Sequence, residues 1–330
     1  MARKLRVEFA GACYHVLNRG NYRSDLFAPA GAARSFQECL FEAGDRFLWR
    51  LHAFTIMRNH FHLAVETPEP NLSLGMKWLQ GTWAVRFNRF RGEVGQPFQG
   101  RFKAIHVERG DALLRVADYI HLNPVRAGVL PFERLLEYPW SSFRLFPRMR
   151  RPSLLEPEVI LRESGGWADT RAGWNGYREH LRAVAAADAK LGDQARGRLS
   201  RGWALGSPAF HVRLAQELEA CSSMVERFEL LGADAEAHRQ ARAEVWEYKL
   251  LRLAEALEVD LANLPAKKSA AEKLRLAAAL KRVTSVSNRW LAERLRMGAA
   301  TSVPSLLHRF WRSGAAENRA FESVLSRFSI

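Results

Sequence analysis

A chain of 330 residues is long enough for two or three domains. Its composition, 48% hydrophobic and 26% charged, predicts a packed core and excludes wholesale disorder. The three cysteines form no Cys-x-x-Cys pair, which argues against a disulfide framework and a structural zinc knuckle. No apolar run is long enough for a spanning helix, and no apolar signal core follows the basic start, so we expect a cytoplasmic protein.

The charge of the chain indicates a polyanionic partner. The formal net charge is +15; residues 1–152 hold 23 Lys and Arg against 13 Asp and Glu, and residues 153–330 hold 27 against 22. The first part therefore carries +10 and the second +5. Such a chain binds nucleic acid or an anionic membrane, and without a basic amphipathic anchor we favour nucleic acid. The excess of Arg over Lys suits phosphate contacts, but a GC-rich genome explains it equally well.

Strand and helix patterns alternate over the first 130 residues. Strands are predicted by apolar and β-branched runs, and helices by an apolar face at helical spacing. The predicted elements are a strand at 12–17, a helix at 32–45, strands at 48–57 and 61–66, a helix at 72–90, a strand at 101–108 and a helix from 111 to about 123. This order predicts a ferredoxin-like α+β sandwich, with an antiparallel sheet and helices on one face.

The remainder of the chain is predicted to be all-α. The proline-rich stretch 131–157 is expected to lead away from the first domain, and 192–206, rich in Gly and Arg, to be a loop or hinge. We expect domains at residues 1–150, 151–235 and 236–330, the second being a linker and helical region. Residues 284–312 predict two helices around a Met-Gly-Ala turn, either a helix-turn-helix that binds DNA or a plain helical hairpin.

Two histidines, His60 and His62, are the first candidates for chemistry. In a strand, residues i and i+2 point to the same face, so the two imidazoles lie side by side while Phe61 points to the other face. Two neutral imidazoles at this separation can bind one divalent metal. Taken alone, the pair is equally explained as two ordinary polar residues of a strand.

A second pair, Tyr119 and Asn123, is spaced by one helical turn. The phenol is a candidate nucleophile and the amide a candidate third metal ligand. The alternatives are a half-buried amphipathic tyrosine and a residue that ends the helix before Pro124. His121 points elsewhere on the helix and is expected to be structural or to contact DNA, and His15 is expected to be a core or surface residue.

Together these residues resemble a known family. His60-Phe61-His62 and the run Tyr-Ile-His-Leu-Asn-Pro-Val-Arg-Ala-Gly at 119–128 look like the single-tyrosine HUH transposases, most closely the branch called REP-associated tyrosine transposases. Residues 14–20 and 100–103 also resemble stretches of that family, so the resemblance covers about 7–145. Asn123 stands where compact relatives usually have glutamine, and Arg58 where proline is frequent.

The resemblance implies an enzyme that cuts and rejoins single-stranded DNA near a hairpin. Residues 1–150 would be its catalytic domain, with Tyr119 as the nucleophile and His60, His62 and Asn123 as ligands of Mg²⁺ or Mn²⁺. It implies a 5′-phosphotyrosine intermediate, palindromic repeat elements as targets, a monomer or homodimer, and a nucleoid-associated cytoplasmic location. Candidate DNA contacts are Asn18, Arg19, Arg23, Arg58, Arg101, Lys103 and Arg126.

Two other functions remain open at this point. A domesticated regulator could bind hairpin DNA without cutting it, in keeping with the long C-terminal extension. A metal hydrolase of small phosphoesters is a third class, which the basic charge disfavours.

Overall fold

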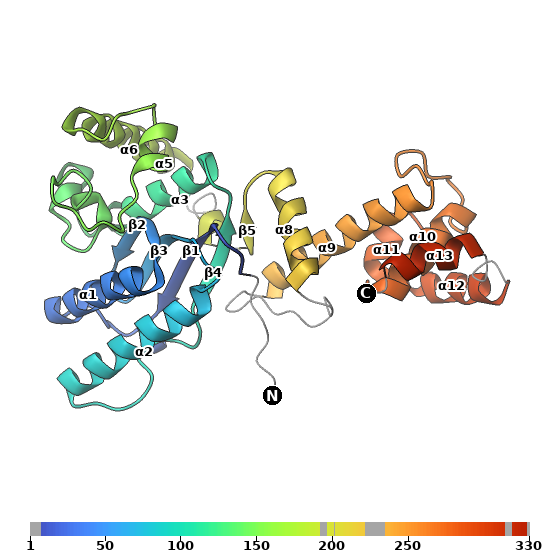
Figure 1. The fold of residues 1–330 in the computed structure, drawn as a ribbon, viewed down its shortest axis with the longest axis horizontal. Coiled ribbons are helices and arrows are strands. Elements are labelled where there is room, and N and C mark those ends of the chain that lie inside the picture. Colours follow the sequence, from blue (N-terminus) through green and yellow to red (C-terminus); the bar gives the residue numbers. More distant parts are fainter. Residues whose placement is uncertain (1–7, 192–196, 201, 222–234, 314–318, 329–330) are drawn as a thin grey trace. The chain divides into compact units, whose positions relative to one another are not determined.

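The structure is a computed structural model that describes residues 8–191, 197–200, 202–221, 235–313 and 319–328 (Figure 1). These residues fall into two compact units. The first contains the described residues up to Ser207, and the second contains α8 (Pro208–Cys221) and the described residues from Arg239 onwards. None of the helices in these residues is long and apolar enough to cross a membrane.

The first unit is built on a five-stranded sheet with the order β2-β3-β1-β4-β5. The strands are β1 (Ala12–Arg19), β2 (Arg50–Ile56), β3 (His60–Thr67), β4 (Lys103–Val107) and β5 (Ala204–Leu205). Strands β1 to β4 pair antiparallel in the ferredoxin-like order, which confirms the predicted fold class. The short β5, inside a stretch expected to be a loop, adds to β4 in parallel.

The two faces of the sheet carry different helices. Helices α1 (Ala30–Phe47) and α2 (Leu72–Arg91) cover one face, and α3 (Asp111–His121) lies on the other (Figure 1). The expectation that the helices lie on one face only is therefore wrong. Phe61 of β3 packs on Phe36 of α1 at 4.7 Å between ring centroids, whereas the His62 ring lies 5.5 Å from Tyr119 of α3. Because neighbouring strand residues point to opposite faces, the histidine pair faces α3.

The stretch 131–157 remains against the sheet, so the expectation that it leads away is wrong. It contains the 3-10 turns η2 (Phe132–Glu137) and η3 (Ser142–Arg144). Along β2, Ile56 N donates to Trp140 O at 2.9 Å and Leu51 N to Leu154 O at 2.7 Å. These bonds satisfy the edge of β2, because an open strand edge would otherwise expose unpaired backbone groups.

Helices α5 (Glu158–Glu163) and α6 (Arg171–Leu191) complete the first unit, with the short turns η1 (Asn21–Arg23), α4 (Asn123–Arg126) and η4 (Gly197–Ser200). Tyr177 of α6 is fully buried, and its hydroxyl lies 2.8 Å from His121 Nδ1. The other ring nitrogen of His121 contacts Ser142 Oγ at 2.8 Å. His121 is therefore a structural residue of the core.

The second unit is helical, as predicted. Its helices are α8, α9 (Ala235–Ala256), α10 (Ala271–Val283), α11 (Asn288–Arg294), α12 (Val303–Arg312) and α13 (Arg319–Phe328), with the 3-10 turn η6 (Ala300–Ser302) before α12. The Ser287 side chain accepts a bond from Trp290 N at the start of α11. Helices α11 and α12 share a core that includes Leu291 and Phe310. The two predicted helices at 284–312 therefore exist.

Candidate active site

The histidine pair begins β3, directly after the turn at Arg58 and Asn59. The rings of His60 and His62 lie 5.1 Å apart between centroids and almost perpendicular, at 89°. His62 is buried and His60 is partly exposed. In the register of the sheet, Arg19 is opposite His60 and Leu17 is opposite His62 on β1.

Hydrogen bonds fix which nitrogen of each histidine carries its proton. His15 Nδ1 lies 2.8 Å from Leu199 O, which can only accept, so His15 donates there and its Nε2 is an acceptor. His62 Nδ1 lies 3.0 Å from that Nε2 and therefore donates to it. His60 Nδ1 donates to Asn59 Oδ1 at 2.7 Å, since the amide nitrogen of Asn59 donates to Arg23 O at 3.3 Å. The lone pair of Nε2 is thus left on both His60 and His62.

Burial keeps these imidazoles neutral. Burial lowers the pKa of His60 to about 4, with a further lowering from the charge of Arg19. Burial likewise holds the pKa of His62 well below its usual value and lowers that of His15 to about 4. Because only the neutral ring has a lone pair to offer, both histidines of the pair are in the ligand form at pH 7.

The α3 side of the site provides Tyr119 and Asn123. Helix α3 ends at His121, because Pro124 has no backbone N–H to continue it, and the chain resumes as α4 at Asn123. The Asn123 side chain is hydrogen-bonded to the His60 ring, and the Tyr119 ring meets the His62 ring edge-on at 5.5 Å and 87°. The structure therefore brings together all four residues that the sequence singled out.

Arg126 lies against the phenol of Tyr119 rather than in the open cavity. Its guanidinium is 5.0 Å from the ring centroid, and it donates to Tyr119 O at 3.0 Å. Asp188 of α6 forms an ion pair with it, and the Arg126 side chain is only 15% exposed. These contacts fix the position of Tyr119.

A cavity of about 300 Å³ opens above the histidine pair. Three cationic side chains, Arg19, Arg101 and Lys103, line it together with His60, His62 and Tyr119. Its remaining lining residues are Leu17, Asn18, Gln99 and Ser200. Three positive charges around two neutral imidazoles make this a place for an anionic group, such as a phosphate of a nucleic acid backbone.

The remaining predicted DNA contacts, Asn18, Arg23 and Arg58, offer no free charged group to the cavity. Asn18 lines the cavity, but its amide bonds Arg19 N at 2.8 Å and Gly100 O at 3.4 Å, so it shapes the cavity wall. Arg58 forms an ion pair with Asp25 at 2.6 Å. Neither Arg58 nor Arg23 is among the cavity-lining residues.

Sequence reasoning missed His15 and Asn59, which hold the two rings of the pair. Asn59 is adjacent to His60 in the sequence, so its hydrogen bond to the His60 ring could have been predicted. His15 was placed in the core or on the surface. Its position becomes predictable only from the pairing of β1 with β3, where it stands opposite the small residue Ala64 and can lean towards His62.

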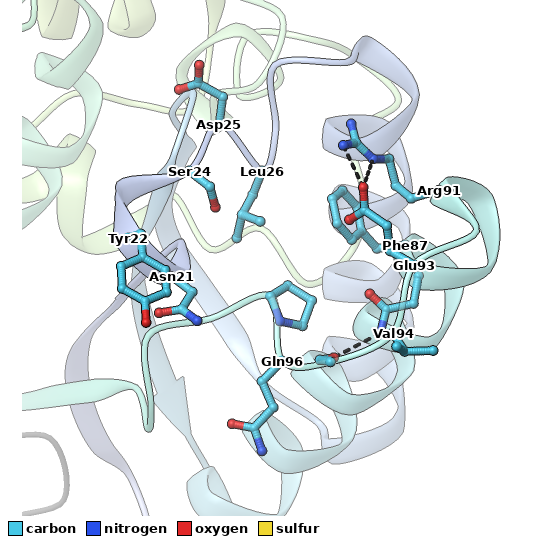
Figure 2. Close-up of a pocket in the computed structure, with 13 residues that line it drawn as sticks. Asn21, Tyr22, Ser24, Asp25, Leu26, Phe87, Arg91, Glu93, Val94 and Gln96 are labelled. Carbon is cyan, nitrogen blue, oxygen red and sulfur yellow. Dashed lines mark hydrogen bonds and ion pairs between the residues drawn. The ribbon is translucent and has the colours of Figure 1, made fainter.

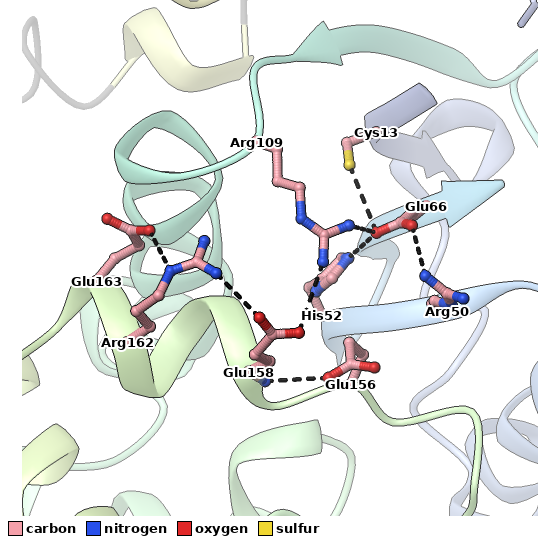
Figure 3. Close-up of polar contacts among 9 residues, drawn as sticks. All are labelled: Cys13, Arg50, His52, Glu66, Arg109, Glu156, Glu158, Arg162 and Glu163. Carbon is pink, nitrogen blue, oxygen red and sulfur yellow. Dashed lines mark hydrogen bonds and ion pairs between the residues drawn. The ribbon is translucent and has the colours of Figure 1, made fainter. Parts of the chain in front are cut away.

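A second cluster of metal-binding side chain types lies elsewhere in the sheet, formed by Cys13, His52 and Glu66 (Figure 3). Protein cations already occupy its carboxylate: Glu66 forms ion pairs with Arg50 at 3.0 Å and with Arg109, and His52 Nε2 lies 3.1 Å away. Burial, and then the charge of Glu66, raise the pKa of Cys13 to about 12, so its thiol is protonated. We therefore interpret this cluster as a structural network, since another cation would meet two guanidinium groups.

Comparisons with known proteins found a family model and similar solved structures. Residues 9–123 match the family model described as "Transposase IS200 like". Among solved structures, "Structure of the REP associates tyrosine transposase bound to a REP hairpin" is similar at 19% identity and a TM-score of 0.36, covering 44% of this chain and 82% of that chain. No curated protein sequence matches the chain.

The matched segment is similar to transposases, which are DNA-processing proteins. Residues 9–123 are similar to the IS200-like transposases, in agreement with the family resemblance of the sequence. The matched segment runs from just before β1 to Asn123, so it contains all four residues of the candidate site.

Proposed function

We propose that the protein is a single-strand DNA endonuclease and strand-transferase that acts next to DNA hairpins. The observation that carries the proposal is the convergence of Tyr119, His60, His62 and Asn123 beneath a cavity with three cationic side chains. A phosphodiester is anionic and repels nucleophiles, so its cleavage needs both a held nucleophile and positive charge around the phosphate.

The proposed reaction is a transesterification. Tyr119 Oη attacks the phosphorus; an Oη–P bond forms and the P–O3′ bond breaks. The phenol loses its proton, the 3′ oxygen gains one, and the 5′ end remains on the tyrosine. Because the number of phosphoester bonds is unchanged, a second 3′-hydroxyl can reverse the step and join a new strand without ATP. Arg126, at 5.0 Å from the ring centroid, holds the phenol in place for the attack.

The donor set fits a divalent metal. His60 Nε2 and His62 Nε2 keep their lone pairs, and the Asn123 amide, which contacts the His60 ring, adds an oxygen. Two imidazoles and one amide oxygen suit Mn²⁺, and Mg²⁺ with more difficulty because it prefers oxygen ligands. When bound, the metal would polarise a non-bridging phosphate oxygen. The protein's part is to orient both rings and to hold Tyr119 beside them.

The DNA backbone is proposed to follow the cationic wall of the cavity. Arg19, Arg101 and Lys103 would contact the phosphates closest to the cut. Asn18 would shape the cavity wall and would not bind a phosphate itself. Arg23 and Arg58 would reach the DNA only further from the cut. Arg126 is assigned the positioning of Tyr119 instead of a phosphate contact, since Asp188 already neutralises it.

Covalent trapping tests the proposal. The protein is incubated with hairpin-bearing single-stranded oligonucleotides and Mn²⁺, and denaturing gels report a protein–DNA adduct. Wild type and Tyr248→Phe, a matched control on α9 in the other unit, should form the adduct, and Tyr119→Phe should not. An adduct that persists in Tyr119→Phe would show that another residue is the nucleophile.

A second candidate function is a hairpin-binding regulator that does not cut DNA. One observation favours it: five polar or basic residues of the α12 region are exposed while its apolar residues pack inward. They are Ser302, Ser305, His308, Arg309 and Arg312. As the second helix of a helix-turn-helix, α12 would place them in a DNA groove. This function predicts hairpin binding that survives the loss of both site histidines, and cleavage by wild type would contradict it.

The proposed partner is hairpin DNA from palindromic repeat elements, which implies a nucleoid-associated cytoplasmic location. We propose a monomer, with a homodimer as the alternative, because the four site residues meet within one chain. Light scattering with and without hairpin DNA measures this state directly.

A further inference from the structure

A second hollow lies on the first unit (Figure 2). It measures about 390 Å³ and is lined by residues of the 21–26 turn and of the 87–97 segment that ends α2. Backbone bonds join the two segments, from Asn21 N to Pro97 O at 2.8 Å and from Gln99 N to Arg19 O at 2.8 Å.

The same two chain segments therefore line both hollows. Arg19 and Gln99 belong to the catalytic cavity, and Asn21 and Pro97 belong to the second hollow. Two residues of chain span at most about 7 Å. The two hollows are therefore reached from neighbouring positions on the same two segments.

Tyr22 forms the rim of the second hollow and is held in an unusual way. Both Tyr22 and Arg23 are in the left-handed region, with φ of 52° and 60°, which is uncommon for residues other than glycine. Neighbouring bonds impose this turn, including Gly20 N to Asn59 O at 2.7 Å and Asn59 Nδ2 to Arg23 O at 3.3 Å. The Tyr22 residue is 94% exposed, so a strained turn presents a large aromatic ring to solvent instead of packing it.

The chemistry of the second hollow differs from that of the catalytic cavity. Its charges are paired within the protein: Arg91 with Glu93 at 2.8 Å, and Asp25 with Arg58 at 2.6 Å. Its other polar lining includes the side-chain amides of Asn21 and Gln96. Figure 2 shows Tyr22 and Asn21 across the hollow from Arg91 and Glu93. Such a lining suits a flat, neutral group with hydrogen-bonding edges, not a phosphate.

We propose that this hollow binds one base of the single-stranded DNA, one or two nucleotides from the cut phosphate. The base stacks on Tyr22, and the amides of Asn21 and Gln96 contact its edge, because an amide offers a donor and an acceptor together. The volume lies in the range of about 300–1,000 Å³ found for small-ligand sites. This inference rests on the proposed function and names the part of the site that selects the DNA sequence.

The test uses hairpin oligonucleotides with randomised bases on both sides of the hairpin. Cut products are sequenced for wild type, Tyr22→Ala and the double variant of Asn21→Ala with Gln96→Ala. Wild type should show a base preference within two nucleotides of the cut. The amide variants should flatten it at that position alone. Phe90→Ala, at another exposed aromatic residue outside the hollow, should keep the preference.

A modified oligonucleotide tests the stacking on the wild-type protein, without any mutation. An abasic nucleotide at the preferred position should weaken binding about 5- to 150-fold, the range expected for one base stacked on an aromatic ring. Tyr22→Ala should weaken binding to intact DNA by a similar factor and to abasic DNA hardly at all, because the two changes remove the same contact. Tyr22→Phe keeps the ring and should restore binding.

Two failures can be told apart. If wild type cuts hairpin DNA but the abasic nucleotide costs nothing, or the preference is unchanged in the double variant of Asn21→Ala with Gln96→Ala, the base site is wrong and the proposed function stands. If wild type neither binds nor cuts any oligonucleotide in the library, the proposed function itself is wrong, and the base site with it.

Discussion

Replacing His15 by leucine isolates the hydrogen bond that orients His62. Leucine keeps a buried side chain of similar size, but it can neither accept from His62 Nδ1 at 3.0 Å nor donate to Leu199 O at 2.8 Å. His62 is 4% exposed, so its N–H would lose its partner without gaining water. A buried polar group left in this state costs about 1–3 kcal/mol.

The unpaired N–H of His62 leads to a specific expectation for metal binding. Without the acceptor on His15, the His62 proton is no longer held on Nδ1, and the tautomer with the proton on Nε2 has no lone pair there for a metal. Loss of such an outer partner lowers metal affinity by about 10- to 100-fold, or roughly 1.4–2.8 kcal/mol, in agreement with the cost of the unpaired group. We therefore expect His15→Leu to weaken Mn²⁺ binding by that factor.

Titration calorimetry with Mn²⁺ on the DNA-free protein measures the effect, and thermal unfolding is recorded in parallel. His15→Gln is the matched control, because its amide oxygen can still accept from His62 and should recover part of the affinity. Equal Mn²⁺ affinity for wild type and His15→Leu, with a loss of thermal stability only, would refute the reasoning and leave His15 as a core residue.

Three further predictions follow from packing and charge. Gly75→Ala should destabilise the protein by about 1–3 kcal/mol in urea unfolding, because the new Cβ would lie 2.1 Å from the buried Trp49 ring. As a control on the same helix, the Cβ of Gly81→Ala meets nothing within 4 Å, so this variant should be more stable by about 0.5–1 kcal/mol. Burial raises the pKa of Glu66, but His52 and two arginines outweigh it and lower the pKa below 4.5. Its contribution to stability is therefore complete above pH 4.5 and is lost as the pH falls through the lowered pKa, and Glu66→Gln should flatten this acid-side loss in unfolding measured against pH. Arg126→Gln should slow adduct formation in single-turnover assays while hairpin affinity measured by fluorescence anisotropy changes little, and an equal loss in both would contradict its assignment to the nucleophile.

The first unit was largely predictable from local patterns. Alternation along β3 correctly placed His60 and His62 on one face, and helical spacing placed Tyr119 near Asn123. The order of the elements gave the ferredoxin-like sheet, because each βαβ crossover has one favoured hand and short connections leave few topologies. Local periodicity and the order of the elements were sufficient for these steps.

Long-range partners were not predictable in this way. Asp188 pairs with Arg126 from α6, 62 residues further along the chain, and Leu199 holds His15 from 184 residues away. We expected the residues after 130 to leave the first domain, because their prolines and 3-10 turns give no periodic pattern. Their contacts with β2 become visible only when the edge of that strand is known to need partners.

The central claim is that Tyr119 Oη attacks DNA from a position fixed beside His60 and His62. Mass spectrometry of a proteolysed adduct, formed on a hairpin oligonucleotide in Mn²⁺, tests it most directly. The account predicts one peptide containing Tyr119 that carries a 5′-linked nucleotide. An adduct on any other residue, or strand cutting that leaves no adduct at all, would contradict it.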